Sequence, residues 1–465
     1  MTKLKPVPPA PGALEGYAAG FDDLFTQLGQ RRGFREYVTG LLTPRERNKT
    51  AAALAGAEPV AGSKSAAAQR VQYFLSESCW DPERVNARRL ELLLAEAATA
   101  PHPEGVLVID DSGDRKDGRA TAHVGRQWLG RLGKTDNGIV TVSTLWADER
   151  IYYPLHARPY TPAHHFARGK SDPAFRTKWR IAVELAVQAV AAEVAFRAVV
   201  ADCAYGDLDD FRGELRRAGA GWVVAVRPKG GTWAYGPDAH TPRDAAGRLR
   251  WRGPEEPGDW QPVQRRFRDG HTEMWWAAEA SLGFWGPDGL TRLVVVTTDP
   301  AALPDKATWY LATNLPRPGG PHDPACGGHS PHPPAGLAEI VRLYGLRHWV
   351  EQGYKQVKNE LGWADFQVRS DIAIRRHQSL VHCAFSFCWT TWFNDPTSGS
   401  APPGLASDTE LERGRPGPIP STALRLTRPI GTQLAPHATR RPQLADPGHR
   451  AVTLVESLVH RAPTT

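Results

Sequence analysis

The 465-residue chain is poor in sulfur, with five cysteines and two methionines. The cysteines are scattered and odd in number, which excludes a disulfide framework and favours a reducing compartment. No run of about 18 uncharged apolar residues occurs, so no membrane-spanning helix is predicted. The most apolar stretch, Leu380–Phe393, is too short and contains His382. The N-terminus lacks the apolar core of a secretory signal. We therefore expect a cytoplasmic protein with no membrane partner.

Charge and size leave room for a nucleic-acid partner. The chain has 57 Lys and Arg against 50 Asp and Glu, a formal net charge of +7. A mildly basic balance permits nucleic-acid binding but does not identify it. With 41% hydrophobic residues, a chain of this length can form roughly two to four domains.

The first segment has the pattern of a small helical domain. Apolar residues recur at helical spacing, and Thr43-Pro44-Arg45-Glu46 has the pattern of a helix start with a capping residue, a proline and a glutamate. The segment also carries many arginines and lysines. Two interpretations stay open: a solvated helical face, or a DNA-binding domain.

The next segment predicts an α/β fold. Three closely spaced strands leave no room for crossover helices and predict an antiparallel meander. Two later strands are linked by helices, as in βαβ units. This is the order of a ribonuclease-H-like mixed sheet flanked by helices. The expected strands are Val106–Ile109, Ile139–Leu145, Ile151–Leu155, Phe196–Ala201 and Trp222–Val226.

Beyond residue 226 the amino-acid composition changes. Glycine, proline and seven of the 16 tryptophans mark a β-rich subdomain inserted in the fold. The tryptophans are expected to fill a β core, with the alternative that Trp275 or Trp276 stacks on a flipped base. The predicted organisation is a helical N-terminal domain (1–100), the core (101–226), the insertion (227–334), the final core helices (335–395) and a Pro/Arg-rich, largely disordered tail (396–465).

Three acids lie in places that suit metal-dependent chemistry. Asp110 and Asp202 each end an apolar run, and Glu351 lies in a later helical stretch. Carboxylates that meet on a rigid frame can flank two divalent ions and act on phosphodiesters. Asp111 is an alternative to Asp110, because successive strand residues point to opposite faces and only one of them should reach a metal.

Glu351 has basic neighbours at helical spacing. At about 100° per residue, Tyr344, Arg347, Glu351 and Lys358 fall on one narrow face of a helix. Arg347 and Lys358 could contact phosphates while Glu351 binds metal. The competing interpretation is an intrahelical ion pair between Arg347 and Glu351, which are four residues apart.

The pattern Tyr-x2-Arg-x3-Glu-x6-Lys resembles the signature of bacterial insertion-sequence DDE transposases. Two further stretches, around Asp110 with Gly125–Gly138 and around Asp202 with Cys203–Gly206, are similar to the first and second Asp motifs of such enzymes. The resemblance covers about residues 20 to 392. It implies Mg²⁺ or Mn²⁺, as two ions, held by Asp110, Asp202 and Glu351 as catalytic residues.

The same resemblance implies the partners. Double-stranded DNA at element terminal repeats and target DNA would be bound by a homodimer associated with the nucleoid. The expected DNA-binding residues are Tyr344, Arg347, Lys358 and Lys134. Two departures are the tail, which does not look like an ordered dimerisation domain, and N-terminal helices without a recognisable DNA-binding motif.

Two alternative functions and two weaker motifs remain. A ribonuclease-H-like nuclease would cleave without joining, and a degenerate transposase would only bind DNA. Gly133-Lys134-Thr135 resembles the end of a P-loop, but Trp128 occupies the place of the required glycine. A loop with His322, Cys326, His329 and His332 is expected to be flexible rather than a zinc site.

Overall fold

The computed structural model describes residues 6–45, 48–57, 64–230, 240–267, 271–281 and 291–394. The predicted disordered tail, 396–465, lies outside these residues, as do Trp233 and Trp285. The chain divides into two compact units. One contains the described residues up to Arg89 and those from Lys355 onward; the other is Leu90–Tyr354.

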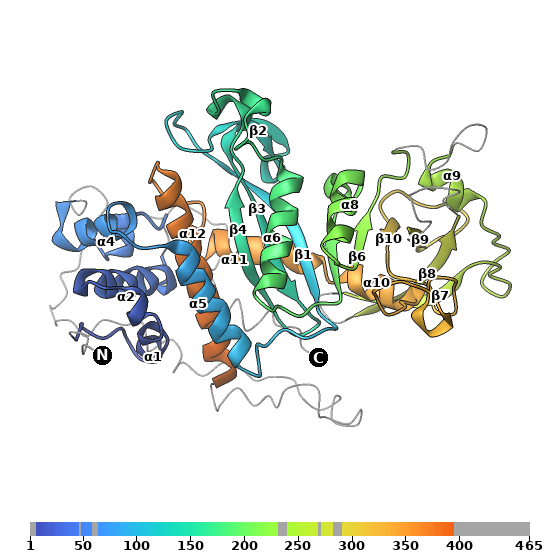
Figure 1. Ribbon diagram of the computed structural model, residues 1–465, viewed down its shortest axis with the longest axis horizontal. Helices are drawn as coiled ribbons and strands as arrows, with labels where there is room; N and C mark the ends of the chain where they lie inside the picture. The colour runs from blue at the N-terminus through green and yellow to red at the C-terminus, as the bar shows by residue number, and fades with distance from the viewer. Residues whose placement is uncertain are drawn as a thin grey trace, which may run out of the picture. The chain divides into compact units, whose positions relative to one another are not determined.

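The first unit is helical (Figure 1). Its long C-terminal helix packs against α2 and α4, far away in sequence. Arg376 of that helix donates hydrogen bonds to the carbonyl oxygens of Trp80 (2.7 Å) and Leu75 (3.1 Å), closing the end of α4. The helices are α1 (Leu14–Ala19), α2 (Leu28–Leu42), α3 (Ala51–Leu54), α4 (Ala66–Ser76), α5 (Pro82–Ala95, which the unit boundary crosses) and α12 (Asp371–Asn394).

The second unit contains the predicted mixed sheet. Its central order is β4-β3-β1-β5-β6, with β3 antiparallel to β1 and β4, and β1, β5 and β6 parallel. The ribonuclease-H-like fold class predicted from strand spacing is thereby confirmed. The strands are β1 (Val106–Arg115), β2 (Gly125–Leu129), β3 (Lys134–Ala147), β4 (Tyr152–Pro159), β5 (Ala198–Ala201) and β6 (Trp222–Ala225).

The β-rich insertion extends this sheet. Its last strand, β10, pairs antiparallel with β6, and β9, β8 and β7 follow outward. The main chain of the insertion is therefore hydrogen-bonded to the same sheet that carries Asp110. The inserted strands are β7 (Gln261–Arg266), β8 (Thr272–Ala280), β9 (Arg292–Thr297) and β10 (Thr308–Thr313), with the short helix α9 (Pro242–Gly247).

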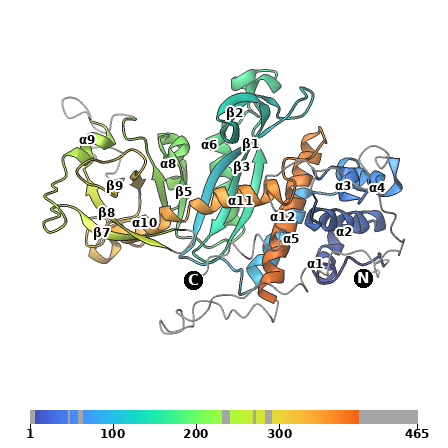
Figure 2. The same ribbon diagram turned by 180° about the vertical axis from the view of Figure 1, so that it is seen from behind.

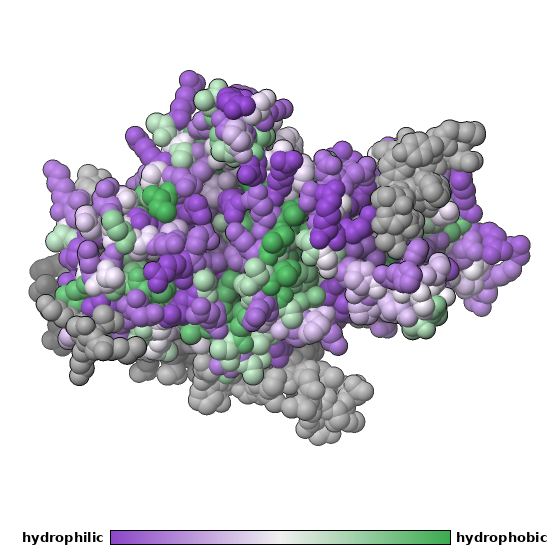
Figure 3. Space-filling view, in the orientation of Figure 1, coloured by the Kyte–Doolittle hydropathy of each residue, from purple (hydrophilic) through white to green (hydrophobic). Residues whose placement is uncertain are grey.

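Helices cover both faces of the sheet. Helix α6 (Lys178–Ala191) packs on β3 and β4 and lies in front of the sheet in Figure 1. Helices α10 (Leu337–Gly345) and α11 (His348–Asn359) run across the opposite face, seen from behind in Figure 2. The outer side of α6 exposes Val187 and Val190, and Figure 3 shows hydrophobic surface over this helix. None of the helices in the described ranges is long and apolar enough to cross a membrane.

Short helices follow the parallel strands. Helix α7 (Cys203–Gly206) comes directly after β5, and α8 (Asp209–Arg217) leads to β6. Gly206 lets α7 pack closely on β6, because a Cβ there would lie 1.9 Å from the carbonyl oxygen of Ala225. Gly213 in α8 has open space around it.

These two glycines give a matched pair for mutation. Gly206→Ala is expected to destabilise the protein by about 1–3 kcal/mol, because backbone must move to admit the methyl group. Gly213→Ala should stabilise it by about 0.5–1 kcal/mol, since alanine has a higher helix propensity than glycine and its methyl group meets no neighbour here. Urea unfolding of both variants measures the difference. Equal midpoints would contradict the close packing of α7.

Candidate functional site

Asp110 lies in β1, and Asp202 directly follows the neighbouring strand β5. Strands β1 and β5 pair in parallel up to Ile109 opposite Ala201, so the two acids follow at the same level. Asp202 is the N-cap of α7, with its Oδ1 accepting the N–H of Ala204 at 2.9 Å. Strand β5 ends before Asp202, which leaves both carboxylates beyond the parallel pair.

The end of β1 differs from the expected one. The apolar run predicts a strand ending at Ile109, but β1 continues to Arg115. The reason is β3, which pairs with β1 from Val106 to Arg115 and opposes Asp110 with Ser143. Asp110 is therefore held by main-chain pairing on one side and is open on the side where β5 has ended.

Glu351 comes from a helix that is broken just before it. The spacing predicts one helical face from Tyr344 to Lys358, but α10 ends at Gly345 and α11 begins at His348. Glycine weakens a helix interior. Between the helices the chain tightens, with the N–H of Arg347 donating to the carbonyl oxygen of Tyr344 at 3.0 Å. Arg347 thus lies in a turn, and the prediction of a single helical face was wrong.

Arg347 contacts all three predicted acids. Its Nη2 lies 3.2 Å from Asp110 Oδ2 and 3.7 Å from Asp202 Oδ2, and its Nη1 lies 3.4 Å from Glu351 Oε1. The two aspartate oxygens can therefore be no farther apart than about 7 Å, the sum of their distances to the shared nitrogen. Residues from β1, the start of α7 and α11 converge on one guanidinium group.

Burial makes this cluster electrostatically costly. The Asp110 side chain is 17% exposed. Burial raises its pKa to about 7; the Arg347 guanidinium acts in the opposite sense, and the charge of Asp202 adds to the increase. Even with Arg347 beside it, Asp110 is only partly ionised near neutral pH, so a further cation at the site would favour its charged form. The Glu351 side chain is 71% exposed, so its pairing with Arg347 contributes little on its own.

Asp111 faces different partners. Its Oδ2 lies 3.1 Å from Lys178 Nζ at the start of α6 and accepts the hydroxyl of Tyr205 at 3.3 Å. The alternation of strand side chains separates the two neighbouring acids, as expected. Of the two, it is Asp110 that lies with Asp202 and Glu351.

Two polar residues beside the cluster were not predicted from the sequence. The hydroxyls of Ser143 and Tyr354 are 2.6 Å apart. Ser143 opposes Asp110 in the register of β3, and Tyr354 lies three residues after Glu351 on α11. Burial raises the pKa of Tyr354 well above its usual value, so its hydroxyl stays protonated. The helical i, i+3 spacing from Glu351 was the available signal for Tyr354.

The other predicted residues lie on different elements, and of these Tyr344 interacts electrostatically with Arg347 and Asp202. Tyr344 is the penultimate residue of α10 and packs edge-on against Trp309, with ring centroids 5.1 Å apart. Lys134 is exposed at the start of β3 and lies 3.3 Å from Asp136. Lys358 is in the last turn of α11, beyond the unit boundary that follows Tyr354.

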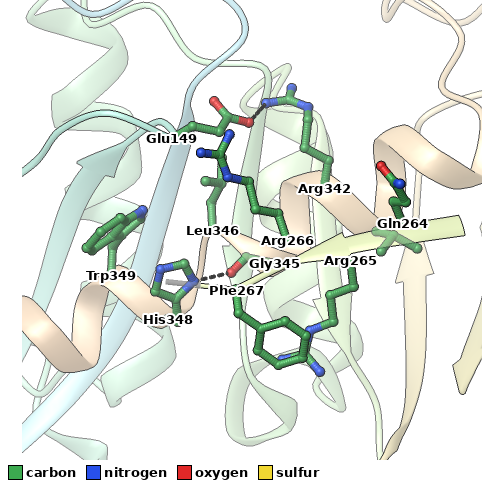
Figure 4. Close-up of a pocket in the computed structure, with 11 residues that line it drawn as sticks. Glu149, Gln264, Arg265, Arg266, Phe267, Arg342, Gly345, Leu346, His348 and Trp349 are labelled. Carbon is green, nitrogen blue, oxygen red and sulfur yellow. Dashed lines mark hydrogen bonds and ion pairs between the residues drawn. The ribbon is translucent and has the colours of Figure 1, made fainter. Parts of the chain in front are cut away.

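A pocket of about 280 Å³ lies on the other side of the helix break (Figure 4). Arg265 packs on the rings of Phe267, Trp275 and Trp309, with its guanidinium carbon 4.1–4.3 Å from each centroid. This stack joins β7 and β8 to the Trp309–Tyr344 contact. Trp275 is 3% exposed, in accord with a packing role; the base-stacking alternative stays a prediction. Across the pocket, Arg342 pairs with Glu149 at 2.8 Å.

The acid cluster has the ligand chemistry that hard divalent cations prefer. All its donors are carboxylate oxygens, the type that Mg²⁺ and Mn²⁺ bind. Asp110 is a largely buried carboxylate whose charged form a cation favours, and Arg347 supplies only part of that charge. Among the described residues, no three histidines, cysteines or acids stand close enough to form a ready-made metal cluster. The donor set fits a divalent metal, provided the acids close around it in place of the guanidinium.

Comparison with known proteins identifies the family. Residues 23–278 match the family described as DDE superfamily endonuclease. This match includes Asp110 and Asp202 and stops before Glu351. The chain is also similar to the probable transposase for insertion sequence element IS701 of Microchaete diplosiphon, with 31% identity over 369 residues, covering 79% of this chain and 85% of the relative. The superfamily generally uses divalent metal ions and cleaves nucleic acid. The chain belongs to the DDE superfamily of endonucleases.

Proposed function

We propose that the protein is a DDE transposase that cleaves and joins DNA at the ends of a mobile element. The observation that carries this proposal is that Asp110, Asp202 and Glu351 all contact the guanidinium group of Arg347. The three acids come from three different elements of the ribonuclease-H-like fold. Membership of the DDE superfamily and the similarity to a probable insertion-sequence transposase support it.

Each residue of the cluster has a distinct task in this proposal. Asp110 and Asp202 hold metal from fixed backbone positions, one within a paired strand and the other at a capped helix start. Glu351 is exposed and closes the site from α11. Arg347 neutralises the acids when no substrate is bound and contacts a DNA phosphate when the site is loaded, since a guanidinium binds phosphate oxygens well.

Asp110, Asp202 and Glu351 would hold Mg²⁺ or Mn²⁺, two ions in the working site. The bound ions supply Lewis-acid stabilisation of the charge that develops on phosphate oxygens. The hydrogen bond between Tyr354 and Ser143 connects α11 to β3 beside the site. Lys134, Tyr344 and Lys358 contribute to DNA binding, and a homodimer engages the two terminal repeats and the target DNA.

A strand-transfer assay tests the function. The protein is incubated with labelled duplexes carrying the element ends, a target plasmid, and Mg²⁺ or Mn²⁺. Cleaved ends joined to target DNA are the expected products. Cleavage without joined products would instead support a stand-alone nuclease, and end binding without cleavage in either metal would support a DNA-binding regulator.

A further inference from the structure

The hairpin of β2 and β3 ends as a two-stranded ribbon. Residues Gly125–Leu129 pair with Gly138–Lys134, whereas the pairing of β1 with β3 stops at Gly138. The turn at Gly130–Leu132 is closed by Gly133, whose φ of +61° is in the left-handed region that favours glycine. This ribbon belongs to the Gly-rich stretch that follows the first acid, and the proposed chemistry leaves it without a role apart from Lys134.

The inner face of the ribbon fixes it beside the acid site. Leu129 is fully buried, and a Cβ on Gly113 would lie 2.6 Å from its Cδ2. Gly113 is three residues beyond Asp110 on β1. At about 3.3 Å per strand residue, the ribbon is anchored roughly 10 Å along the strand from that carboxylate.

The outer face of the ribbon carries both apolar and basic side chains. Arg126 and Trp128 alternate with buried residues along β2 and so point outward. Trp128 is 60% exposed and Leu132, at the tip, is 43% exposed. Large apolar side chains exposed at the tip of a hairpin favour an interaction partner over solvent.

The charge of this region points to a polyanion. From Asp114 to Gly138 there are six basic and three acidic residues. Two of the acids form ion pairs with nearby residues: Asp117 with Arg115 at 3.4 Å, and Asp136 with Lys134 at 3.3 Å. Within the described part of the chain, no acid pairs with the side chains of Arg119, Arg126 or Arg131.

From these observations we propose that the β2–β3 ribbon docks in a groove of duplex DNA next to the scissile phosphodiester. The proposal rests on the proposed function. A two-stranded ribbon fits the major groove of B-DNA. Arg126 and Arg131 contact phosphates, and Trp128 makes an apolar contact with base edges in the groove. The ribbon is anchored at Gly113, roughly 10 Å along β1 from Asp110, so we expect its contact near the cleavage site, within the first turn of the element end.

Two single variants separate the two kinds of contact. Binding of element-end duplex is measured by fluorescence anisotropy at several salt concentrations. Arg126→Ala should flatten the log–log salt dependence by about 0.9, the loss of one phosphate contact. Trp128→Ala should weaken binding about tenfold or more with no change in slope, while Trp128→Phe keeps most of the affinity. Arg252→Ala, an exposed arginine paired with Glu256, and Met274→Ala, an exposed apolar residue on the β7–β8 hairpin, are the matched controls.

Hydroxyl-radical footprinting then locates the contact. Wild-type protein should protect base pairs within the first turn from the cleavage site, and Trp128→Ala should lose that protection alone. The proposal would be overturned if both ribbon variants kept the wild-type affinity, salt dependence and footprint. It would also be overturned if the only effect of Trp128→Ala were to convert a dimer to a monomer. A failure of the proposed function would give a different result: wild-type protein would bind the element ends but make no cleaved or joined product.

Discussion

Arg347→Gln is expected to destabilise the metal-free protein by about 3 kcal/mol, because it leaves the largely buried carboxylate of Asp110 without its neighbouring cation. The Arg347 side chain is 18% exposed, and it touches Asp110 and Asp202 at 3.2 and 3.7 Å. Glutamine keeps much of the side-chain length but carries no charge. The loss should be measured by urea unfolding in the presence of EDTA.

The same variant should respond strongly to metal. A divalent ion can take over the positive charge that Arg347 supplies, so saturating Mn²⁺ should restore much of the stability of Arg347→Gln. Wild-type protein should gain less, since the ion must displace the guanidinium. Binding to the folded state at about 100 times the Kd is worth about 2.7 kcal/mol, enough to be seen in the midpoint. The readout is stability and does not depend on activity.

Arg342→Gln is the matched control. Arg342 lies in α10, is 35% exposed, and pairs with Glu149 on the other side of the helix break. Its removal should cost no more than about 1 kcal/mol, with or without metal. If Arg347→Gln costs only about 0.3–0.5 kcal/mol and ignores Mn²⁺, Arg347 is simply an ion-pair partner of Glu351.

Local sequence patterns predicted the architecture of the sheet but not its edges. Apolar runs such as Val106–Ile109 are visible because they are buried on both sides. The sequence does not show that β1 continues to Arg115 or that β2 forms a strand, because both depend on pairing with β3. Likewise, the spacing from Tyr344 to Lys358 assumed one regular helix, and the tight turn at Arg347 interrupts it.

The acids and the pairing of Arg347 with Glu351 could be predicted, but the contact of Arg347 with both aspartates could not. Asp110, Asp202 and Glu351 stand in local motifs that a sequence displays. That Arg347 reaches Asp110, 237 residues away, depends on how α10 and α11, which flank it, cross the sheet, and no local pattern encodes this. The same holds for Lys178 and Tyr205, whose contacts with Asp111 separate that acid from its neighbour.

Asp202→Asn is expected to abolish cleavage while leaving the fold and DNA binding intact. Asparagine has nearly the shape of aspartate and is an equally good N-cap, so the hydrogen bond to the N–H of Ala204 at the start of α7 should persist. What is lost is one negative charge in the proposed metal site. A bound metal contributes several kcal/mol of transition-state stabilisation, and at about 1.36 kcal/mol per factor of ten this corresponds to a loss of about a thousandfold in rate.

Asp210→Asn is the control for Asp202→Asn. Asp210 is an exposed acid in the first turn of α8, eight residues further along the chain. Single-turnover cleavage of element-end duplex in Mg²⁺ should be unchanged in this variant. Affinity for the duplex should be close to that of the wild type in both variants, because it comes mainly from lysine and arginine contacts with phosphates. Asp202→Asn protein that cleaves at the wild-type rate, with unaltered thermal unfolding, would show that Asp202 is not a metal ligand.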